Sequence, residues 1–181
     1  MSDNSPETSQ LGFIHVISGN GKGKTTSALG LALRAAGHGF RTLIIQFMKK
    51  GWIYGELKVL EDIPEIVIIQ FGTPEFVDKA NPRKIDFDEA RAALDRARIA
   101  IIDEKWDLLI LDEVNVALDF KLISENDIID LIKQKPKNLE LVLTGRDASN
   151  NIIELADYYT EIRERKHPYQ RKILARKGVE Y

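Results

Sequence analysis

The fold of this chain is decided at residues 18–26, which read Ser18-Gly19-Asn20-Gly21-Lys22-Gly23-Lys24-Thr25-Thr26. An apolar run, residues 13–17, comes directly before this stretch, and a helical pattern rich in alanine and leucine, residues 27–34, comes directly after it. A phosphate-binding loop needs this order of strand, glycine-rich loop and helix, because its N–H groups surround phosphate oxygens while the helix dipole points its positive end at the same anion. A chance Gly-Lys-Thr in a flexible loop would not explain the strand before it and the helix after it.

The composition of the loop predicts how it binds phosphate. Glycines permit the positive φ angles and the close backbone approach that such a loop requires. Lys24 is expected to lie along the phosphates, and the Thr25 hydroxyl is expected to bind Mg²⁺ on the phosphate chain. The usual pattern has a glycine at position 18, but this chain has serine there and its first glycine is Gly19. The departure leaves open which phosphate the loop holds, so the reaction need not be ordinary γ-phosphoryl transfer.

The size and composition of the chain predict one globular domain. With 181 residues, of which 44% are hydrophobic, the chain fits a single domain over residues 11–181. Residues 1–10 are polar and acidic, lack the layout of a signal peptide, and are expected to form a disordered tail. The 26 basic and 28 acidic residues give a net charge of −2, which provides no basic field for nucleic acid, and no apolar run is long enough to span a membrane.

The lack of cysteine restricts the chemistry further. It excludes disulfides, iron–sulfur clusters, thiolate zinc sites and cysteine nucleophiles, and it fits a cytoplasmic protein. The three histidines, His15, His38 and His167, are far apart and have no metal-ligand spacing, so each is expected to be structural or exposed.

Apolar runs alternate with helical patterns along the chain. Strands are expected at residues 11–18, 42–47, 66–71, 108–113, 139–144 and 158–162, and helices at residues 24–38, 86–104, 124–134 and 149–157. Ser124 and Ser149 are expected to cap the last two helices. This alternation predicts an α/β fold of the P-loop NTPase-like (RecA-like) type, with a mainly parallel sheet flanked by helices on both faces.

A second motif stands at the end of the fourth expected strand, where Leu108-Leu109-Ile110-Leu111 is followed by Asp112 and Glu113. This is the Walker B pattern, in which a strand tip places an acid beside the Mg²⁺ of the phosphate loop. The predicted metal ligands are therefore Thr25, Asp112 and Glu113. One carboxylate is expected to hold Mg²⁺ directly or through water and the other to contact ribose, and the sequence does not decide between them.

Two arginines are candidates for further phosphate contacts. Arg34 interrupts the apolar pattern of the first helix, where it is either a solvated side chain or a second cation near the phosphates. Arg146 stands at the carboxyl end of the fifth strand, where it is placed to neutralise phosphate.

Two loops carry candidates for binding a large substrate. The loop after the second strand contains Lys49, Trp52 and Tyr54, and the irregular segment after the third strand contains Phe76. In open α/β sheets ligands bind at the carboxyl ends of the strands, where both loops are expected to lie. The alternative is that these side chains pack against the core or stay solvated.

Residues 12–181 resemble the ATP:corrinoid (cob(I)alamin) adenosyltransferases of the CobA/CobO/BtuR type. The loop motif is moderately specific by itself, and the ordered set of motifs is highly specific. The set consists of the loop from Gly19 to Thr26, Leu111-Asp112-Glu113, Leu143-Thr144-Gly145-Arg146, Glu154-Leu155-Ala156-Asp157, Lys166-His167-Pro168-Tyr169 and Lys177-Gly178-Val179-Glu180-Tyr181.

The resemblance implies that a Co(I) corrinoid attacks the 5′ carbon of ATP and that inorganic triphosphate leaves, in adenosylcobalamin biosynthesis or salvage. It implies an ATP bound in the reverse sense to that of a kinase, with residues 20–26 on the triphosphate, Thr25 and Glu113 on Mg²⁺ (or Mn²⁺), and Arg34 on the phosphate chain. Lys24, Arg34, the metal ion and the loop amides would then stabilise the leaving group. No general base is needed, because Co(I) is already a strong nucleophile.

The resemblance also implies partners and a corrinoid site. In this family aromatic residues displace the axial ligand of a Co(II) corrinoid so that it is reduced more easily, and the corresponding loop here, Phe71–Phe76, lacks the tryptophan that some members carry. Phe76, Trp52 and Tyr54 are the candidates for corrinoid contact. A separate reductase or flavodoxin-like electron donor is implied, and members of the family are typically homodimers. The physiological corrinoid is left open.

Two other functions stay open at this point. A small-molecule kinase or ATPase would use the same loop and acids but release ADP, and the missing glycine at position 18 weighs against it. A carrier or regulator would bind ATP and a corrinoid without turnover, and the intact Lys24, Thr25 and Glu113 argue against such an inactive site.

Overall fold

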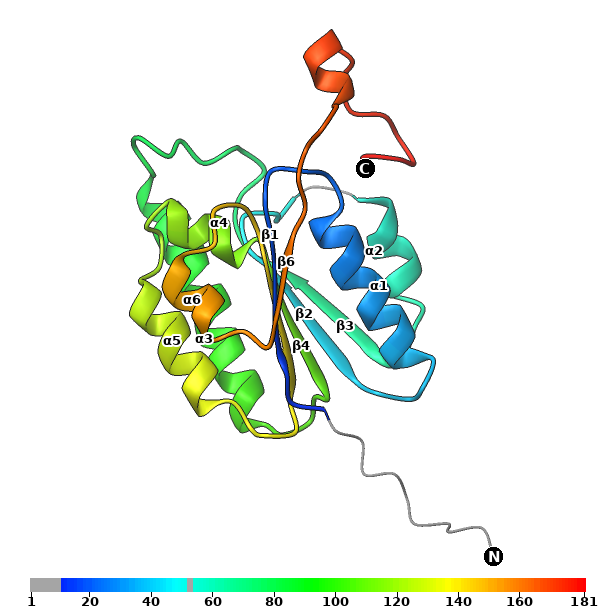
Figure 1. The fold of residues 1–181 in the computed structure, drawn as a ribbon, viewed down its shortest axis with the longest axis vertical. Coiled ribbons are helices and arrows are strands. Elements are labelled where there is room, and N and C mark those ends of the chain that lie inside the picture. The colour runs from blue at the N-terminus through cyan, green and yellow to red at the C-terminus, as the bar shows by residue number, and fades with distance from the viewer. Residues whose placement is uncertain (1–10, 52–53) are drawn as a thin grey trace, which may run out of the picture.

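The computed structural model describes residues 11–51 and 54–181. The expected tail, residues 1–10, lies outside this range, and so does Trp52. One sheet forms the middle layer of the fold, with helices on both of its faces (Figure 1). The predicted α/β class with a parallel sheet is confirmed.

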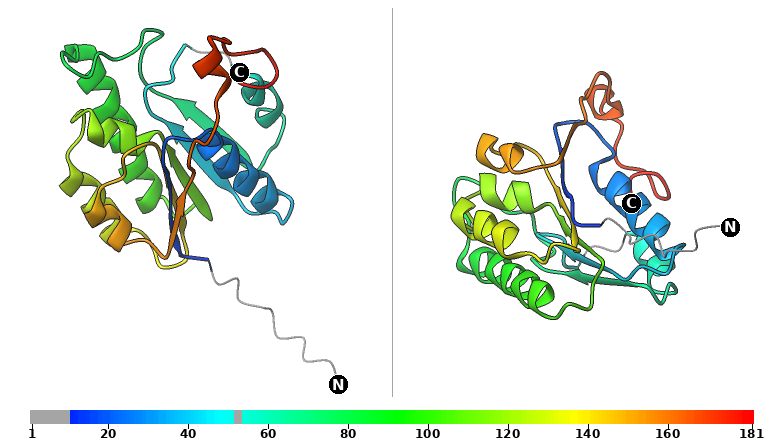
Figure 2. Two further views of the ribbon diagram at one scale, coloured as in Figure 1. Left: turned by 45° about the horizontal axis from the view of Figure 1, so that its top comes forward. Right: turned by 60° about the horizontal axis from the view of Figure 1, so that its bottom comes forward.

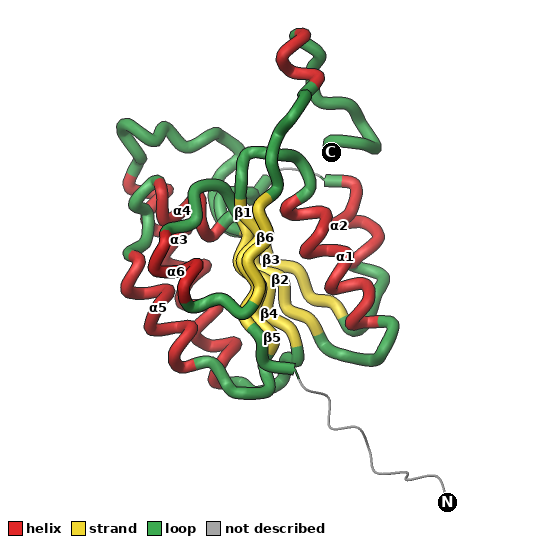
Figure 3. The backbone as a smooth tube through the Cα atoms, in the orientation of Figure 1, coloured by secondary structure: helices red, strands yellow, loops and turns green. Residues whose placement is uncertain are grey.

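The sheet has six strands in the order β3-β2-β4-β5-β1-β6, and every neighbouring pair is parallel. All the carboxyl ends of the strands therefore lie at one edge of the sheet, the upper edge in Figure 3. The strands are β1 Ile14–Ser18, β2 Thr42–Gln46, β3 Ile66–Gln70, β4 Leu108–Asp112, β5 Glu140–Thr144 and β6 Tyr158–Glu161.

The helices cover the two faces unequally, as the two views of Figure 2 also show. One face carries α1 (Lys24–Ala36) and α2 (Gly55–Leu60). The other carries α3 (Lys84–Ile102), α4 (Val114–Asp119), α5 (Glu125–Gln134) and α6 (Asn150–Glu154). A short 3₁₀ helix, η1 (Pro168–Arg171), follows β6 beyond the edge of the sheet.

Alternation along the strands divides the core between these two layers. In β2, Leu43 and Ile45 belong to the hydrophobic cluster under α3 and α5, while Ile44 belongs to the cluster under α1. All three side chains are fully buried. A strand that is covered on both faces is expected to be apolar at every position. The short apolar runs in the sequence therefore predicted the central strands well.

The register of the sheet brings polar strand ends together. Gln46 at the end of β2 is the register partner of Asp112 at the end of β4, and Thr144 at the end of β5 is the partner of Ile17 in β1, one residue before the phosphate loop begins. Three consecutive strands of the sheet, β2, β4 and β5, thus deliver polar side chains to one place, beside the loop that leads into α1.

The remaining differences from the predicted elements are local. Ser124 and Ser149 cap α5 and α6 as predicted, although α6 ends at Glu154 rather than near Asp157. Helix α3, which was expected at residues 86–104, begins two residues earlier, at Lys84, because Asp86 closes a capping box with Arg83. Among the described residues, none of the helices combines the length and the apolar character needed to cross a membrane.

The Arg83–Asp86 pair predicts a pH dependence of stability. Asp86 is buried and accepts hydrogen bonds from the Arg83 guanidinium at 2.8 and 3.1 Å, which lower the pKa of this carboxyl. A carboxyl with a lowered pKa stabilises the folded state above its unfolded-state pKa, and this contribution is lost as the pH falls through the folded-state value. The difference in unfolding free energy between the wild type and Asp86→Asn is therefore expected to be constant above about pH 5 and to shrink below about pH 4.

Urea unfolding between pH 7 and pH 3 measures this difference. Asp88→Asn is the matched control, because Asp88 lies on the same helix in a well-exposed ion pair with Lys84, and such pairs contribute little. A gap between wild type and Asp86→Asn that does not change with pH would contradict the assignment.

Candidate active site

The phosphate loop joins β1 to α1 at the carboxyl edge of the sheet. Gly19 and Gly23 have φ angles of 104° and 125°, which strongly favour glycine. A Cβ atom at Gly19 would also collide with the carbonyl oxygen of Ile162. The N–H of Gly21 donates to that same carbonyl at 2.8 Å, so the loop is fastened to the chain just beyond β6. Because α1 begins at Lys24, the loop lies at the positive end of the helix dipole.

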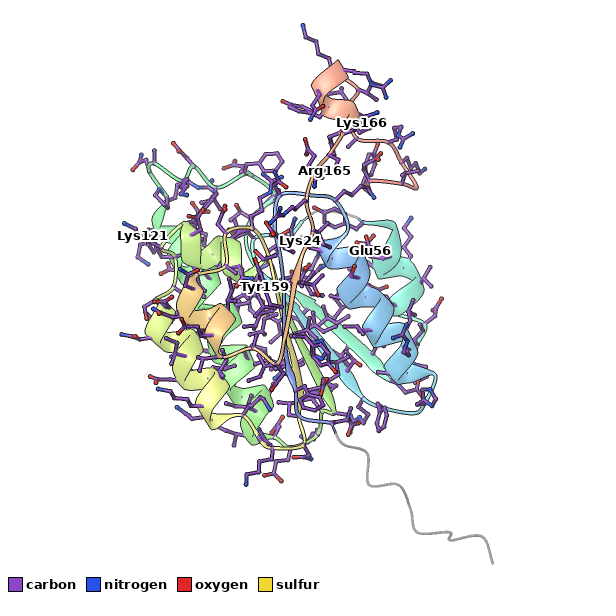
Figure 4. The ribbon with its side chains drawn as sticks, in the orientation of Figure 1. Lys24, Glu56, Lys121, Tyr159, Arg165 and Lys166 are labelled. Carbon is purple, nitrogen blue, oxygen red and sulfur yellow. The ribbon has the colours of Figure 1, made fainter. Side chains whose placement is uncertain are left out.

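Lys24 is folded back over the loop. Its side chain is buried, with 7% of the residue exposed, and its ammonium donates to the carbonyls of Gly19 at 2.7 Å and Gly21 at 2.8 Å. Burial lowers the pKa of Lys24. Figure 4 shows Lys24 at the start of α1, below the segment that carries Arg165 and Lys166. Lys24 is therefore held against the loop at the start of α1, as the phosphate-loop prediction expects.

Asp112 is the centre of the polar cluster at the strand ends. Its carboxylate is 1% exposed and accepts hydrogen bonds from Thr25 at 3.0 Å, Thr144 at 2.6 Å and Gln46 at 3.0 Å. Burial alone would raise the pKa of Asp112, but the charge and hydrogen bond of Lys49, together with the two hydroxyls, hold it below its ordinary value. Asp112 is thus an ionised buried carboxylate that orients the Thr25 hydroxyl of the phosphate loop.

Lys49 supplies the counter-charge, a role that the sequence did not reveal. Its ammonium lies 2.6 Å from Asp112 Oδ2, 3.0 Å from Thr25 Oγ1 and 4.0 Å from Glu113 Oε1, and its side chain is 12% exposed. Burial alone would lower the pKa of Lys49, but the two carboxylates raise it overall. The only signal for this role was its position, three residues beyond Gln46 at the carboxyl end of β2.

Glu113 turns the chain from β4 into α4. It has a left-handed backbone with a φ of 63°, and its N–H donates to the Thr144 hydroxyl at 3.0 Å. Burial raises the pKa of its carboxyl. The side chain lines the cavity described next, whereas Asp112 lies beneath it. The two adjacent acids of the motif therefore occupy different environments: Asp112 is enclosed by hydrogen-bond donors, and Glu113 faces the cavity.

A cavity of about 830 Å³ opens above the phosphate loop. Residues 20–26 form its floor, Lys49, Tyr54 and Glu113 line one part of the wall, and Arg146 lines another. Glu56 at the start of α2 also lines it and is marked in Figure 4. A volume of this size lies within the range of small-molecule and cofactor sites.

Most of the predicted site residues that the structure describes meet at this cavity, but Gly19, Arg34, Phe76 and Asp112 do not line it. Arg34 lies in the last turn of α1, beside a separate cavity of about 200 Å³. Ten residues of helix separate it from Lys24, which corresponds to about 15 Å. The contact of Arg34 with the phosphate chain therefore stays a prediction that the cavity above the loop does not support. Phe76 is 87% exposed and is not among the lining residues, and Trp52 lies outside the described residues.

The C-terminal segment forms a wall of the cavity, which the sequence also did not reveal. After β6 the chain leaves the sheet, forms η1 and returns toward the start of α1 (Figure 1). The Lys22 ammonium donates to the carbonyl of Val179 at 3.1 Å, and the Glu164 N–H donates to the Asn20 side chain at 2.9 Å. His167, Tyr169 and residues 178–181 line the cavity. The family motifs at the end of the chain thus lie against the phosphate loop.

Removal of residues 178–181 is expected to weaken ATP binding about tenfold, equal to about 1.4 kcal/mol of lost contact. The melting temperature is expected to fall by no more than about 2 °C, because this segment contributes no buried residues to the core. Titration calorimetry with ATP and a thermal melt measure the two effects. Leu174→Ala is the matched control, because Leu174 is exposed in the same segment and does not line the cavity. Unchanged ATP affinity in the truncated protein would show that the wall is not part of the nucleotide site.

A metal ion is implied by the phosphate loop and the acids at the end of β4. Across residues 11–51 and 54–181, no three His, Cys, Asp or Glu side chains gather into a metal-binding group. Oxygens of Thr25, Asp112 and Glu113 do gather, and they already hold a cation, the Lys49 ammonium. Hydroxyl, carboxylate and phosphate oxygens are the ligands that Mg²⁺ prefers. The residues present therefore fit a magnesium ion.

Comparison with known proteins identifies the family. The family model described as ATP:corrinoid adenosyltransferase BtuR/CobO/CobP matches residues 10–181. The chain is 36% identical over 172 residues to a corrinoid adenosyltransferase of Pseudomonas aeruginosa, covering 95% of this chain and 85% of that protein. It is 33% identical to the corrinoid adenosyltransferase of Escherichia coli (strain K12) and 32% identical to the corrinoid adenosyltransferase CobA of Salmonella typhimurium, in each case over 95% of this chain and 87% of the relative. The chain therefore belongs to the ATP:corrinoid adenosyltransferase family.

Proposed function

We propose that this protein transfers the 5′-deoxyadenosyl group of ATP to the Co(I) centre of a corrinoid and releases triphosphate, in adenosylcobalamin biosynthesis or salvage. The observation that carries the proposal is the meeting of Lys24, Thr25 and the acids Asp112 and Glu113 at the base of one large cavity. Family membership supplies the substrates, ATP as the donor and a corrinoid as the acceptor.

The reaction exchanges one bond for another. The electron pair of Co(I) forms the bond to C5′, while the bond between C5′ and the bridging oxygen breaks and its electron pair leaves with the triphosphate. No proton moves in this step. Negative charge grows on the departing oxygen, so the protein accelerates the reaction by placing fixed positive groups around the triphosphate.

The residues of the loop supply those groups. Backbone amides of residues 19–26 and the Lys24 ammonium bind the triphosphate, with the helix dipole of α1 behind them. Arg146 lines the same cavity and adds a second cation from the end of β5. In this arrangement the loop binds the leaving group. This role differs from that of the loop in γ-phosphoryl transfer enzymes, which have glycine at the position of Ser18.

Thr25, Asp112 and Glu113 would hold Mg²⁺ or Mn²⁺, which supplies positive charge to the triphosphate oxygens. Asp112 orients the Thr25 hydroxyl from beneath. Glu113 faces the cavity, so it is the acid placed to contact the ion or the ribose.

The proposed corrinoid contact rests on one aromatic residue of the cavity. Of the three aromatic residues expected at the corrinoid, Tyr54 lines the cavity. We include in the proposal a separate reductase that supplies electrons, since the cysteine-free sequence offers no thiol carrier. A homodimer and a cytoplasmic location belong to the same proposal, and light scattering on the purified protein tests the first.

The test of the proposal is to mix the protein with ATP, Mg²⁺ and chemically reduced cob(I)alamin, to follow the corrinoid spectrum, and to identify the phosphate product. Adenosylcobalamin together with triphosphate is the expected result. ADP with an unchanged corrinoid would overturn the proposal in favour of a kinase or ATPase. Spectral binding without either product would overturn it in favour of a carrier or regulator.

A further inference from the structure

Two cations compete for the same oxygens at the base of the cavity. The Lys49 ammonium is hydrogen-bonded to Asp112 Oδ2 at 2.6 Å and to Thr25 Oγ1 at 3.0 Å. These are two of the three side chains that would hold the metal ion. Mg²⁺ binds its oxygen ligands at about 2.0–2.1 Å. An ion that close to both oxygens would lie in the space of the ammonium, so the ion and the ammonium cannot hold them together.

Lys24 is not in this competition, although it lies close by. Its ammonium is bonded to the backbone carbonyls of Gly19 and Gly21, not to a carboxylate. The two buried lysines of the site therefore have different partners. One belongs to the phosphate loop, and the other belongs to the oxygens of the metal site.

The ammonium of Lys49 has space to withdraw. The residue lines the cavity, and its Nζ lies 5.6 Å from the centre of the Tyr54 ring, at a distance where the face of the ring attracts a cation. The phosphate oxygens of a bound nucleotide lie in this same cavity under the proposed function and offer the ammonium new acceptors. The side chain can therefore leave Asp112 without becoming an unpaired buried charge.

We propose that Lys49 is a built-in counter-ion that keeps Asp112 and Thr25 in position until a divalent metal ion displaces it into the cavity. Lys49 is a positioning residue in this scheme, because it acts through the oxygens of Asp112 and Thr25. The inference rests on the proposed function only in placing a metal ion at these oxygens. It does not depend on which group of ATP is transferred.

Binding of Mn²⁺ without nucleotide or corrinoid tests the exchange, with free Mn²⁺ measured by electron paramagnetic resonance. Lys49→Met is expected to bind Mn²⁺ at least about tenfold more tightly than the wild type, since the ion no longer displaces a cation from its ligands; this corresponds to about 1.4 kcal/mol. Lys49→Gln keeps the test available if the methionine variant does not fold.

Lys24→Met is the matched control for charge. It removes one positive charge near the same carboxylates but frees neither oxygen, so it measures the through-space electrostatic effect alone. Its affinity for Mn²⁺ is expected to rise less than that of Lys49→Met, by no more than about threefold, because the Lys24 ammonium contacts neither oxygen. Lys50→Met, whose ammonium pairs with Glu89 in an exposed position, is expected to leave Mn²⁺ affinity unchanged.

Thermal melting gives a second readout. Without metal, Lys49→Met is expected to melt below the wild type, and Mg²⁺ is expected to raise the melting temperature of the variant more than that of the wild type. Equal Mn²⁺ affinities for Lys49→Met and Lys24→Met would overturn the exchange, and so would the failure of every variant to bind Mn²⁺. Either failure would leave the adenosyl transfer assay unaffected, so the two proposals fail separately.

Discussion

Lys24→Ala is expected to reduce the rate constant for adenosyl transfer about 10²–10³-fold, the effect of removing one fixed group that stabilises developing negative charge. The ammonium of Lys24 is the buried cation of the phosphate loop, and it is held in place by two backbone carbonyls. Its removal leaves the triphosphate with the loop amides, Arg146 and the metal ion. The rate is measured from the corrinoid spectrum with saturating ATP and chemically reduced cob(I)alamin.

The fold of this variant is expected to persist, because the Lys24 ammonium bonds to carbonyls of the loop and Lys24 belongs to neither hydrophobic cluster. Circular dichroism and a thermal melt check this. Lys133→Ala is the matched control, since Lys133 is an exposed lysine of α5 on the other face of the sheet, and its turnover is expected to equal that of the wild type. Turnover by Lys24→Ala within threefold of the wild-type rate would remove Lys24 from the site.

Asp112→Asn is expected to lower the free energy of unfolding by about 3–5 kcal/mol, because it leaves the Lys49 ammonium buried without its partner. Asp112 accepts hydrogen bonds from four side chains, and an amide nitrogen in its place would face donors. In a chain of this length the loss corresponds to a fall in melting temperature of about 6–20 °C. Chemical and thermal unfolding without nucleotide measure it.

The matched control is Asp119→Asn, which breaks an ion pair with the largely exposed Lys79 and is expected to change stability by less than about 1 kcal/mol. The double variant Lys49→Met/Asp112→Asn removes both charges, so it is expected to be more stable than Asp112→Asn alone. A double variant that is less stable than either single variant would show that the cost arises from lost packing and not from an unpaired charge.

The parts of the site that the sequence predicts are those built from contiguous residues. The phosphate loop lies between one strand and one helix, and Asp112 ends an apolar strand, so each motif carries its own structural context. The helices α2 and α4 were not predicted, because each has only six residues and neither begins with a side-chain cap. Glu113 at the start of α4 adopts a left-handed backbone conformation, which the neighbouring residues do not predict.

The residues that were missed depend on contacts between distant parts of the chain. Lys49 reaches Asp112 because β2 and β4 are neighbours in the sheet. The sequences of these two strands do not predict that they are neighbours. The C-terminal segment reaches the loop through single hydrogen bonds such as Lys22 to Val179. The contact of Arg34 with the phosphate chain, which the family resemblance implied, stays a prediction: Arg34 lies about 15 Å along α1 from Lys24 and does not line the cavity above the loop.

The strand at the edge of the sheet is tied to the phosphate loop more closely than to any helix. Among the described strands β6 pairs only with β1, and just beyond it the N–H of Ile162 donates to Ser18 while its carbonyl accepts from Gly21. We therefore expect local opening of this edge to loosen the loop as well. In hydrogen-exchange terms, the amides of Gly21 and Ile162 are expected to open together, and a nucleotide bound at the loop is expected to slow exchange along β6, which does not line the cavity.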